Sequence, residues 1–182
     1  SDSLTYHRTY CRQPIAWDDF AHNPGNAIKV DSLIYFIPDQ YGAVFEIQEI
    51  ADSIHVTRID RTKYSGLTAG QYCFYDKHLY SYGGYGFWHT NGQLRMYLDD
   101  KNEWDIVKLN EIIPSTNFFT WYDPKEKMLW CGRQDYVNEV LDAKTFKTGF
   151  EALRLNLKSQ KWERMGTVNY TPLNAGVYEG VF

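Results

Sequence analysis

The sequence lacks three features that would each point to a class of partner. Positive charge is not in excess, since 19 Lys and Arg stand against 23 Asp and Glu in 182 residues, a formal net charge of −4. Nucleic-acid binding depends on neutralising phosphates, so we expect no nucleic-acid partner. No apolar run approaches the roughly 18 residues of a membrane span, and no N-terminal run resembles a signal peptide.

Cysteine is scarce. The three cysteines (Cys11, Cys73 and Cys131) are odd in number and widely spaced, so they form no disulfide framework and no metal-binding pair. Cys73 and Cys131 lie within apolar runs, which favours small buried core residues. The chain begins at Ser1 without Met. This start is compatible with removal of a leader, and we expect a secreted or periplasmic location in preference to a cytoplasmic one.

Motifs for catalysis and cofactor binding are also missing. The sequence has no HExxH, no GxSxG, no Walker loop and no zinc-ligand spacing. Gly83-Gly84-Tyr85-Gly86 lacks the third glycine of a dinucleotide loop and the helix that would follow. The five histidines are scattered among polar neighbours. We therefore assign no catalytic residue, no metal and no cofactor.

Aromatic residues, in contrast, are abundant at 17%, with 15 Tyr, 10 Phe and 6 Trp. These residue types favour strands over helices. Short alternating runs are separated by polar turns throughout, and nearly every Pro falls in a turn or loop, as a sheet requires. For residues 135–146, which show one short helical face, helix and loop both remain open. The predicted fold class is all-β.

A repeat is visible in this pattern. Leu94–Leu98 is an alternating strand followed by a charged turn and Trp104, and Leu153–Leu157 is followed in the same way by Trp162. Ile54 occupies the corresponding place in an earlier unit, so the three positions are spaced by 50 and 58 residues. Each unit also has an upstream hairpin. Four short strands per unit at a period of roughly 50 residues indicate the blades of a β-propeller.

The middle unit identifies the type of blade. Leu79–Tyr82 is an apolar strand that ends in Gly83-Gly84, and six residues separate the later Tyr97 from Trp104. This arrangement resembles the kelch repeat. Paired glycines let the backbone adopt positive φ and let strands approach closely. The resemblance covers about residues 25–168 and is strong only in the middle unit. Another antiparallel sandwich or barrel is the alternative.

The units predict a division of the chain. An N-terminal segment, residues 1–24, is either a tail or a stray blade strand. Three blades follow, and then the start of a truncated fourth blade; their ranges are 25–64, 65–114, 115–168 and 169–182. Because closed propellers have at least four blades, we expect remaining blades or a second copy to complete the ring.

The resemblance also implies where a ligand would bind. In kelch propellers, the loops that follow the second strand of each blade and those that join blades crowd one face. Exposed aromatic side chains there, with Arg and Asn nearby, suit sugar stacking or protein contacts. The alternative for Phe87 and Trp88 is packing against a neighbouring blade. We expect these loops at residues 39–42, 85–91 and 133–136. The candidate ligand-binding residues in them are Tyr41, Tyr85, Phe87, Trp88, His89, Arg133 and Tyr136.

The predicted function is that of a non-catalytic scaffold that recognises a protein or a glycan. The alternative is a fragment of a propeller enzyme acting on carbohydrate, since kelch-like propellers include copper oxidases and sugar epimerases. The copper-ligand arrangement of the oxidases has no residue-by-residue match here, so no catalytic residue is transferred from them.

Overall fold

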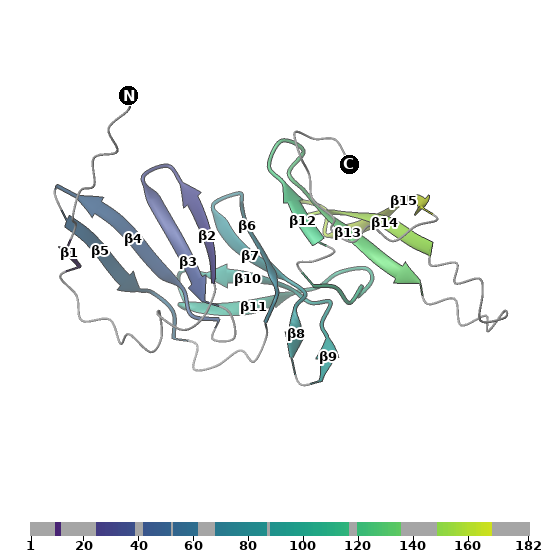
Figure 1. Cartoon of the computed structure of the whole chain (residues 1–182), viewed down its shortest axis with the longest axis horizontal. Helices are drawn as coiled ribbons and strands as arrows, with labels where there is room; N and C mark the ends of the chain where they lie inside the picture. Colours follow the sequence, from purple (N-terminus) through teal and green to yellow (C-terminus); the bar gives the residue numbers. More distant parts are fainter. Residues whose placement is uncertain are drawn as a thin grey trace, which may run out of the picture. The chain divides into compact units, whose positions relative to one another are not determined.

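The computed structural model describes residues 10–11, 25–38, 42–51, 53–61, 68–86, 88–116, 120–135 and 149–168. Within these ranges the chain consists of strands, turns and extended segments, without a helix (Figure 1). The described part therefore contains no helix that could cross a membrane. The prediction of an all-β fold is confirmed. The chain divides into two compact units, Ser1–Gly66 and Leu67–Phe182, which are described separately below.

The first unit contains one five-stranded sheet in the order β1-β5-β4-β3-β2. Four of its strands follow one another as antiparallel neighbours, and the short β1 lies parallel to β5, with Tyr10 opposite Ser53. The strands are β1 (Tyr10–Cys11), β2 (Gly25–Val30), β3 (Leu33–Pro38), β4 (Phe45–Ile50) and β5 (Ser53–Arg58). The N-terminal segment thus contributes an added edge strand to this sheet.

A small apolar cluster and one buried carboxylate hold the first sheet. Phe45 and Val56 are buried on neighbouring strands. The Asp60 carboxylate accepts a hydrogen bond from the Val44 N–H at 2.9 Å and pairs with the Arg58 guanidinium at 3.0 Å. A buried carboxylate with these partners avoids the cost of an unpaired charge.

The second unit contains two four-stranded antiparallel sheets and a separate small hairpin. One sheet has the order β11-β10-β7-β6, and the other has the order β12-β13-β14-β15. Four-stranded antiparallel sheets of this kind are consistent with propeller-type blades. The strands are β6 (Gln71–Tyr75), β7 (His78–Tyr82), β8 (Tyr85–Gly86), β9 (His89–Thr90), β10 (Leu94–Leu98), β11 (Glu103–Val107), β12 (Thr120–Asp123), β13 (Met128–Asp135), β14 (Gly149–Asn156) and β15 (Lys161–Val168).

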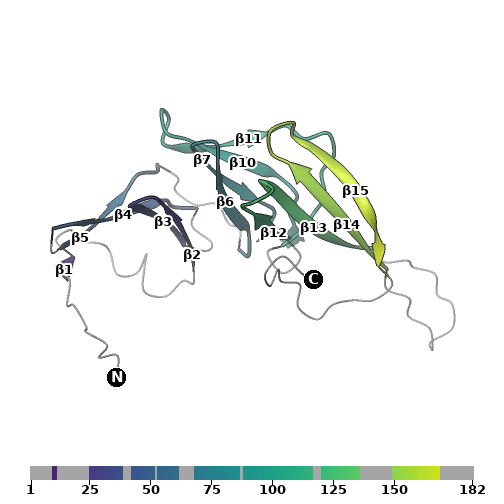
Figure 2. The ribbon, with the colours of Figure 1, turned by 90° about the horizontal axis from the view of Figure 1, so that it is seen from above.

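The core of the second unit lies between its two four-stranded sheets (Figure 2). Leu94 of β10 and Leu155 of β14 belong to this one cluster, and both are fully buried. The Trp162 ring meets the Tyr82 ring edge-on, with 5.4 Å between centroids, and the Trp162 backbone N–H donates to the Asn110 Oδ1 at 2.9 Å. The period-2 alternation of apolar residues places these side chains on the facing surfaces of the sheets.

The glycine pair at the end of β7 is required by its surroundings. Gly83 and Gly84 have φ values of +68° and +103°. A Cβ on Gly83 would lie 2.3 Å from the Ser115 carbonyl oxygen. The Gly84 N–H donates to that same oxygen at 2.8 Å, and the Gly83 N–H donates to the Gln93 oxygen at 3.1 Å. The predicted positive φ and close approach of strands are both confirmed at this pair.

Two local predictions were wrong. Residues 133–135 were expected in a loop, but they extend β13, where Arg133 is paired with Glu151 of β14. The expected loop at residues 85–91 contains a two-stranded hairpin, β8–β9. The open question of a helix concerned residues 135–146; Asp135 ends β13, and the remainder lies outside the described residues, as does the expected fourth unit.

Candidate functional site

The β8–β9 hairpin is a backbone-anchored projection. Tyr85 pairs with Thr90, and Gly86 pairs with His89. On its other side, Tyr85 forms a bridge with Thr68, in which the two backbone N–H groups donate to the partner carbonyl oxygens at 2.7 and 2.8 Å. These bonds fix the hairpin next to the glycine pair. A fixed hairpin lowers the conformational entropy lost when a ligand binds.

Trp88 lies in the turn of this hairpin and is the most exposed large apolar side chain among the described residues. Its exposed fraction is 93%, and Tyr85, in the first strand of the same hairpin, is 45% exposed. Trp88 also has a φ of +66°, a conformation that costs a bulky L residue about 1–2 kcal/mol. In the structure of this chain alone, the Trp88 side chain is therefore not buried against either four-stranded sheet of the second unit. Phe87 lies outside the described residues.

Only some of the predicted site residues lie together. Tyr85, Trp88 and His89 lie together in one hairpin, and all three are exposed. Arg133 has its backbone in β13, away from the predicted loop, and its side chain is outside the described part. Two further predicted residues, Tyr41 and Tyr136, also lie outside the described residues.

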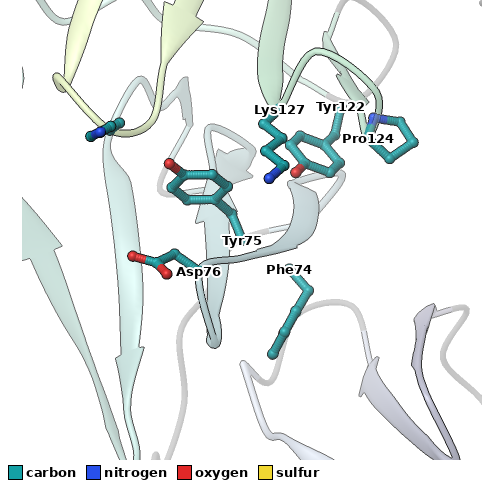
Figure 3. A pocket seen from close by; sticks show the side chains of 7 residues that line it. Phe74, Tyr75, Asp76, Tyr122, Pro124 and Lys127 are labelled. Atoms are coloured by element: carbon teal, nitrogen blue, oxygen red, sulfur yellow. The ribbon is translucent and has the colours of Figure 1, made fainter.

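A second candidate site lies at the other end of β7. It is a hollow of about 420 Å³, which we call the turn pocket (Figure 3). It is formed around the β6–β7, β12–β13 and β14–β15 turns. His78 begins β7 next to the first of these turns, whereas Tyr82 ends β7 next to the hairpin, so the two sites lie at opposite ends of the strand. The pocket is lined by Phe74, Tyr75, Asp76, Tyr122, Pro124, Lys127 and Lys158.

The turn pocket combines an aromatic wall with a charged rim. Tyr75 and Tyr122 are half-buried and pack on the core of the second unit, whereas Asp76, Lys127 and Lys158 are exposed. Burial, with smaller contributions from Cys73, Tyr75 and Asp123, raises the pKa of Tyr122 to about 12. The Tyr122 hydroxyl therefore stays protonated at neutral pH and can donate a hydrogen bond.

Sequence analysis missed the turn pocket because its residues come from three separate turns. One signal was present: Tyr75-Asp76 and Tyr122-Asp123 are the same dipeptide at the end of the first strand in two successive units. A repeated aromatic residue beside two turns at the same end of neighbouring sheets indicates a shared surface.

Metal and thiol chemistry are not apparent in the described part of the chain. No group of three or more His, Cys, Asp or Glu side chains lies close enough there to hold a metal ion. Cys73 and Cys131 are buried, as predicted, and burial raises the pKa of the Cys73 thiol to about 12. A thiol of that pKa is almost entirely protonated at neutral pH and is a poor nucleophile.

The comparisons with known proteins support the fold but do not identify a function. No protein-family model matches the sequence, and no curated protein matches it. Among solved structures, the chain is similar to the structure of YjhT, with a TM-score of 0.57 and 15% sequence identity. The match covers 81% of this chain and 52% of that chain, so this chain spans about half the length of YjhT. At this identity the likeness concerns the fold alone.

Proposed function

We propose that this chain is a non-catalytic binding module that captures a protein or a glycan through the β8–β9 hairpin, carried on kelch-like propeller blades. The observation that carries the proposal is Trp88: its indole is 93% exposed in a backbone conformation with a φ of +66°. A side chain that adds strain and no burial contributes little to folding. Together, the exposure and the backbone conformation make this indole the ligand contact that we propose.

The chemistry of an exposed indole suits both classes of ligand. Its flat apolar face can stack on the C–H face of a sugar ring or fill a pocket of a partner protein, and Trp is enriched among residues that dominate binding energies. Tyr85 adds a second exposed aromatic ring with a hydroxyl group. The backbone bonds to Thr68 hold the hairpin in place before binding.

Trp88→Gly is expected to weaken ligand binding by at least about tenfold, because truncating a central aromatic contact commonly costs about 2 kcal/mol or more. The free energy of unfolding should stay the same or rise slightly, since Gly adopts positive φ without strain. The measurement is binding of the labelled chain to glycan and protein arrays, with thermal unfolding of each variant in parallel.

Ile106→Ala is the matched control for this test, because Ile106 is an apolar side chain on β11 that is 61% exposed. It should bind the same array features as the unchanged chain. Equal binding by Trp88→Gly and the unchanged chain would refute the role of the hairpin. A drop in melting temperature of Trp88→Gly by many degrees would instead assign the indole to the core.

The proposal includes completion of the ring, since a closed propeller has at least four blades and the match to YjhT covers only 52% of that chain. Further blades or a second copy of this chain would supply the further sheets. Sedimentation velocity distinguishes the two, because the mass of a dimer would support the second copy. A monomer at all concentrations would exclude the second copy and leave further blades as the source.

A further inference from the structure

We propose that the turn pocket is a second binding site, independent of the hairpin, for a small planar anion of the aromatic carboxylate class. The size of the pocket supports a small molecule. At about 420 Å³ it falls within the range of about 300–1,000 Å³ typical of ligand sites. The side chains of Tyr75, Tyr122 and Lys127 converge on one space in Figure 3.

The charge of the pocket selects an anion. Lys127 and Lys158 contribute two ammonium groups against the single carboxylate of Asp76. Within the described ranges, the ion pairs of the second unit involve other side chains and leave both lysines without an acidic partner. Two ammonium groups at the rim of a concave site attract a carboxylate. Because salt screens this attraction over a short distance, it favours a small ligand that lies close to both ammonium groups.

The walls of the pocket select a ring. Tyr75 and Tyr122 present half-buried aromatic surfaces that favour stacked or edge-on contact with another ring. The protonated Tyr122 hydroxyl can donate to an oxygen of the ligand, and Asp76 can accept from a phenolic hydroxyl. A ligand with a carboxylate at one end, a flat ring and a hydroxyl at the other end matches all three groups.

The turn backbone at the pocket has ordinary hairpin geometry. Asp76, Lys77 and Lys127 have φ values of +46°, +67° and +58°. Positive φ at both central residues is usual in a two-residue hairpin turn, and turn residues outside the pocket, such as Asn102 and Gln160, also have positive φ. The turns therefore set the positions of Asp76 and Lys127, which both line the pocket.

The turn that carries Lys127 is also held in place. The Asp123 carboxylate accepts the Lys125 N–H at 2.8 Å and the Glu126 N–H at 3.2 Å. The Arg154 guanidinium on β14 approaches Glu126 at 3.9 Å. These contacts involve Lys125 only through its backbone N–H, and they do not involve Lys127. Replacing either lysine side chain therefore leaves the contacts of the turn in place.

The test is isothermal titration of the full chain with 4-hydroxybenzoate as the probe. We expect a dissociation constant below about 1 mM, a modest affinity suited to a ligand of this size. Lys127→Gln should weaken it at least fivefold, and Lys127→Gly should weaken it equally with an unchanged or raised melting temperature. Lys125→Gln, in the same turn but outside the pocket, should bind as the unchanged chain does. Trp88→Gly should also bind normally, which separates this site from the hairpin.

Three further probes define the ligand class. Cyclohexanecarboxylate has the same charge without a planar ring and should bind at least threefold more weakly. Inorganic phosphate alone should not compete. The proposal is overturned if 4-hydroxybenzoate does not bind at concentrations up to about 10 mM, if Lys127→Gln and Lys125→Gln bind alike, or if D-glucuronate binds more tightly than 4-hydroxybenzoate.

Discussion

Gly83→Ala is expected to lower the free energy of unfolding by about 3–5 kcal/mol. Gly83 has a φ of +68°, which costs Ala about 1–2 kcal/mol. The new methyl group would lie 2.3 Å from the Ser115 carbonyl oxygen, a backbone atom that already accepts the Gly84 N–H and therefore has little freedom to move. Relief of that contact would have to break the hydrogen bonds of the glycine pair, at about 1 kcal/mol each.

Urea unfolding followed by tryptophan fluorescence measures this change. Gly70→Ala is the matched control: Gly70 is also buried, but a Cβ there would meet Tyr72 at an ordinary 3.5 Å, so a change below about 1 kcal/mol is expected. Equal stability of the Gly83→Ala and Gly70→Ala variants would contradict the claim that the glycine pair is required where the strands meet.

Trp162→Ala is expected to destabilise the second unit by about 3–5 kcal/mol. The Trp162 side chain is only 8% exposed and lies in the cluster between the two sheets, with its ring against Tyr82. Its truncation would leave a cavity between the sheets that the packed leucines cannot fill, and the cost of a buried aromatic truncation is of this size.

Trp162→Phe separates ring packing from the indole nitrogen. The Trp162 Nε1 is buried and has no hydrogen-bond partner within the described part of the chain. Phe removes this unsatisfied donor, which offsets part of the lost contact, so the loss of stability should be less than half of that of Trp162→Ala. Trp88→Gly serves as the exposed control. A Trp162→Ala loss below about 1 kcal/mol would mean that the sheets do not depend on this contact.

Local sequence patterns predicted the strands and the glycine pair because these features depend on neighbouring residues. Alternating apolar residues set which face of each sheet is buried, and Gly83-Gly84 marked a backbone that needs positive φ. Tyr97 and Trp104, whose spacing marked the middle unit, are register partners on β10 and β11, with ring centroids 5.4 Å apart.

Features that depend on distant residues were not predictable from one sequence. Arg133 lies in a strand because β14 supplies partners along the full length of β13, and this register is set by tertiary pairing. The partner of Trp162 is Tyr82 on the other sheet, which no local pattern identifies. The turn pocket has the same origin, since its walls come from one turn of the first four-stranded sheet of the second unit and two turns of the other.

The central claim is that the β8–β9 hairpin contacts the ligand, and an NMR titration of the full chain with the tightest ligand from the arrays tests it directly. The indole N–H signal of Trp88 and the amide signals of Tyr85, Gly86 and His89 are predicted to shift first. The buried Trp162 indole signal should stay unchanged. Shifts confined to residues of the turn pocket, such as Tyr75 and Lys127, or no change at Trp88 at saturating ligand, would contradict the account.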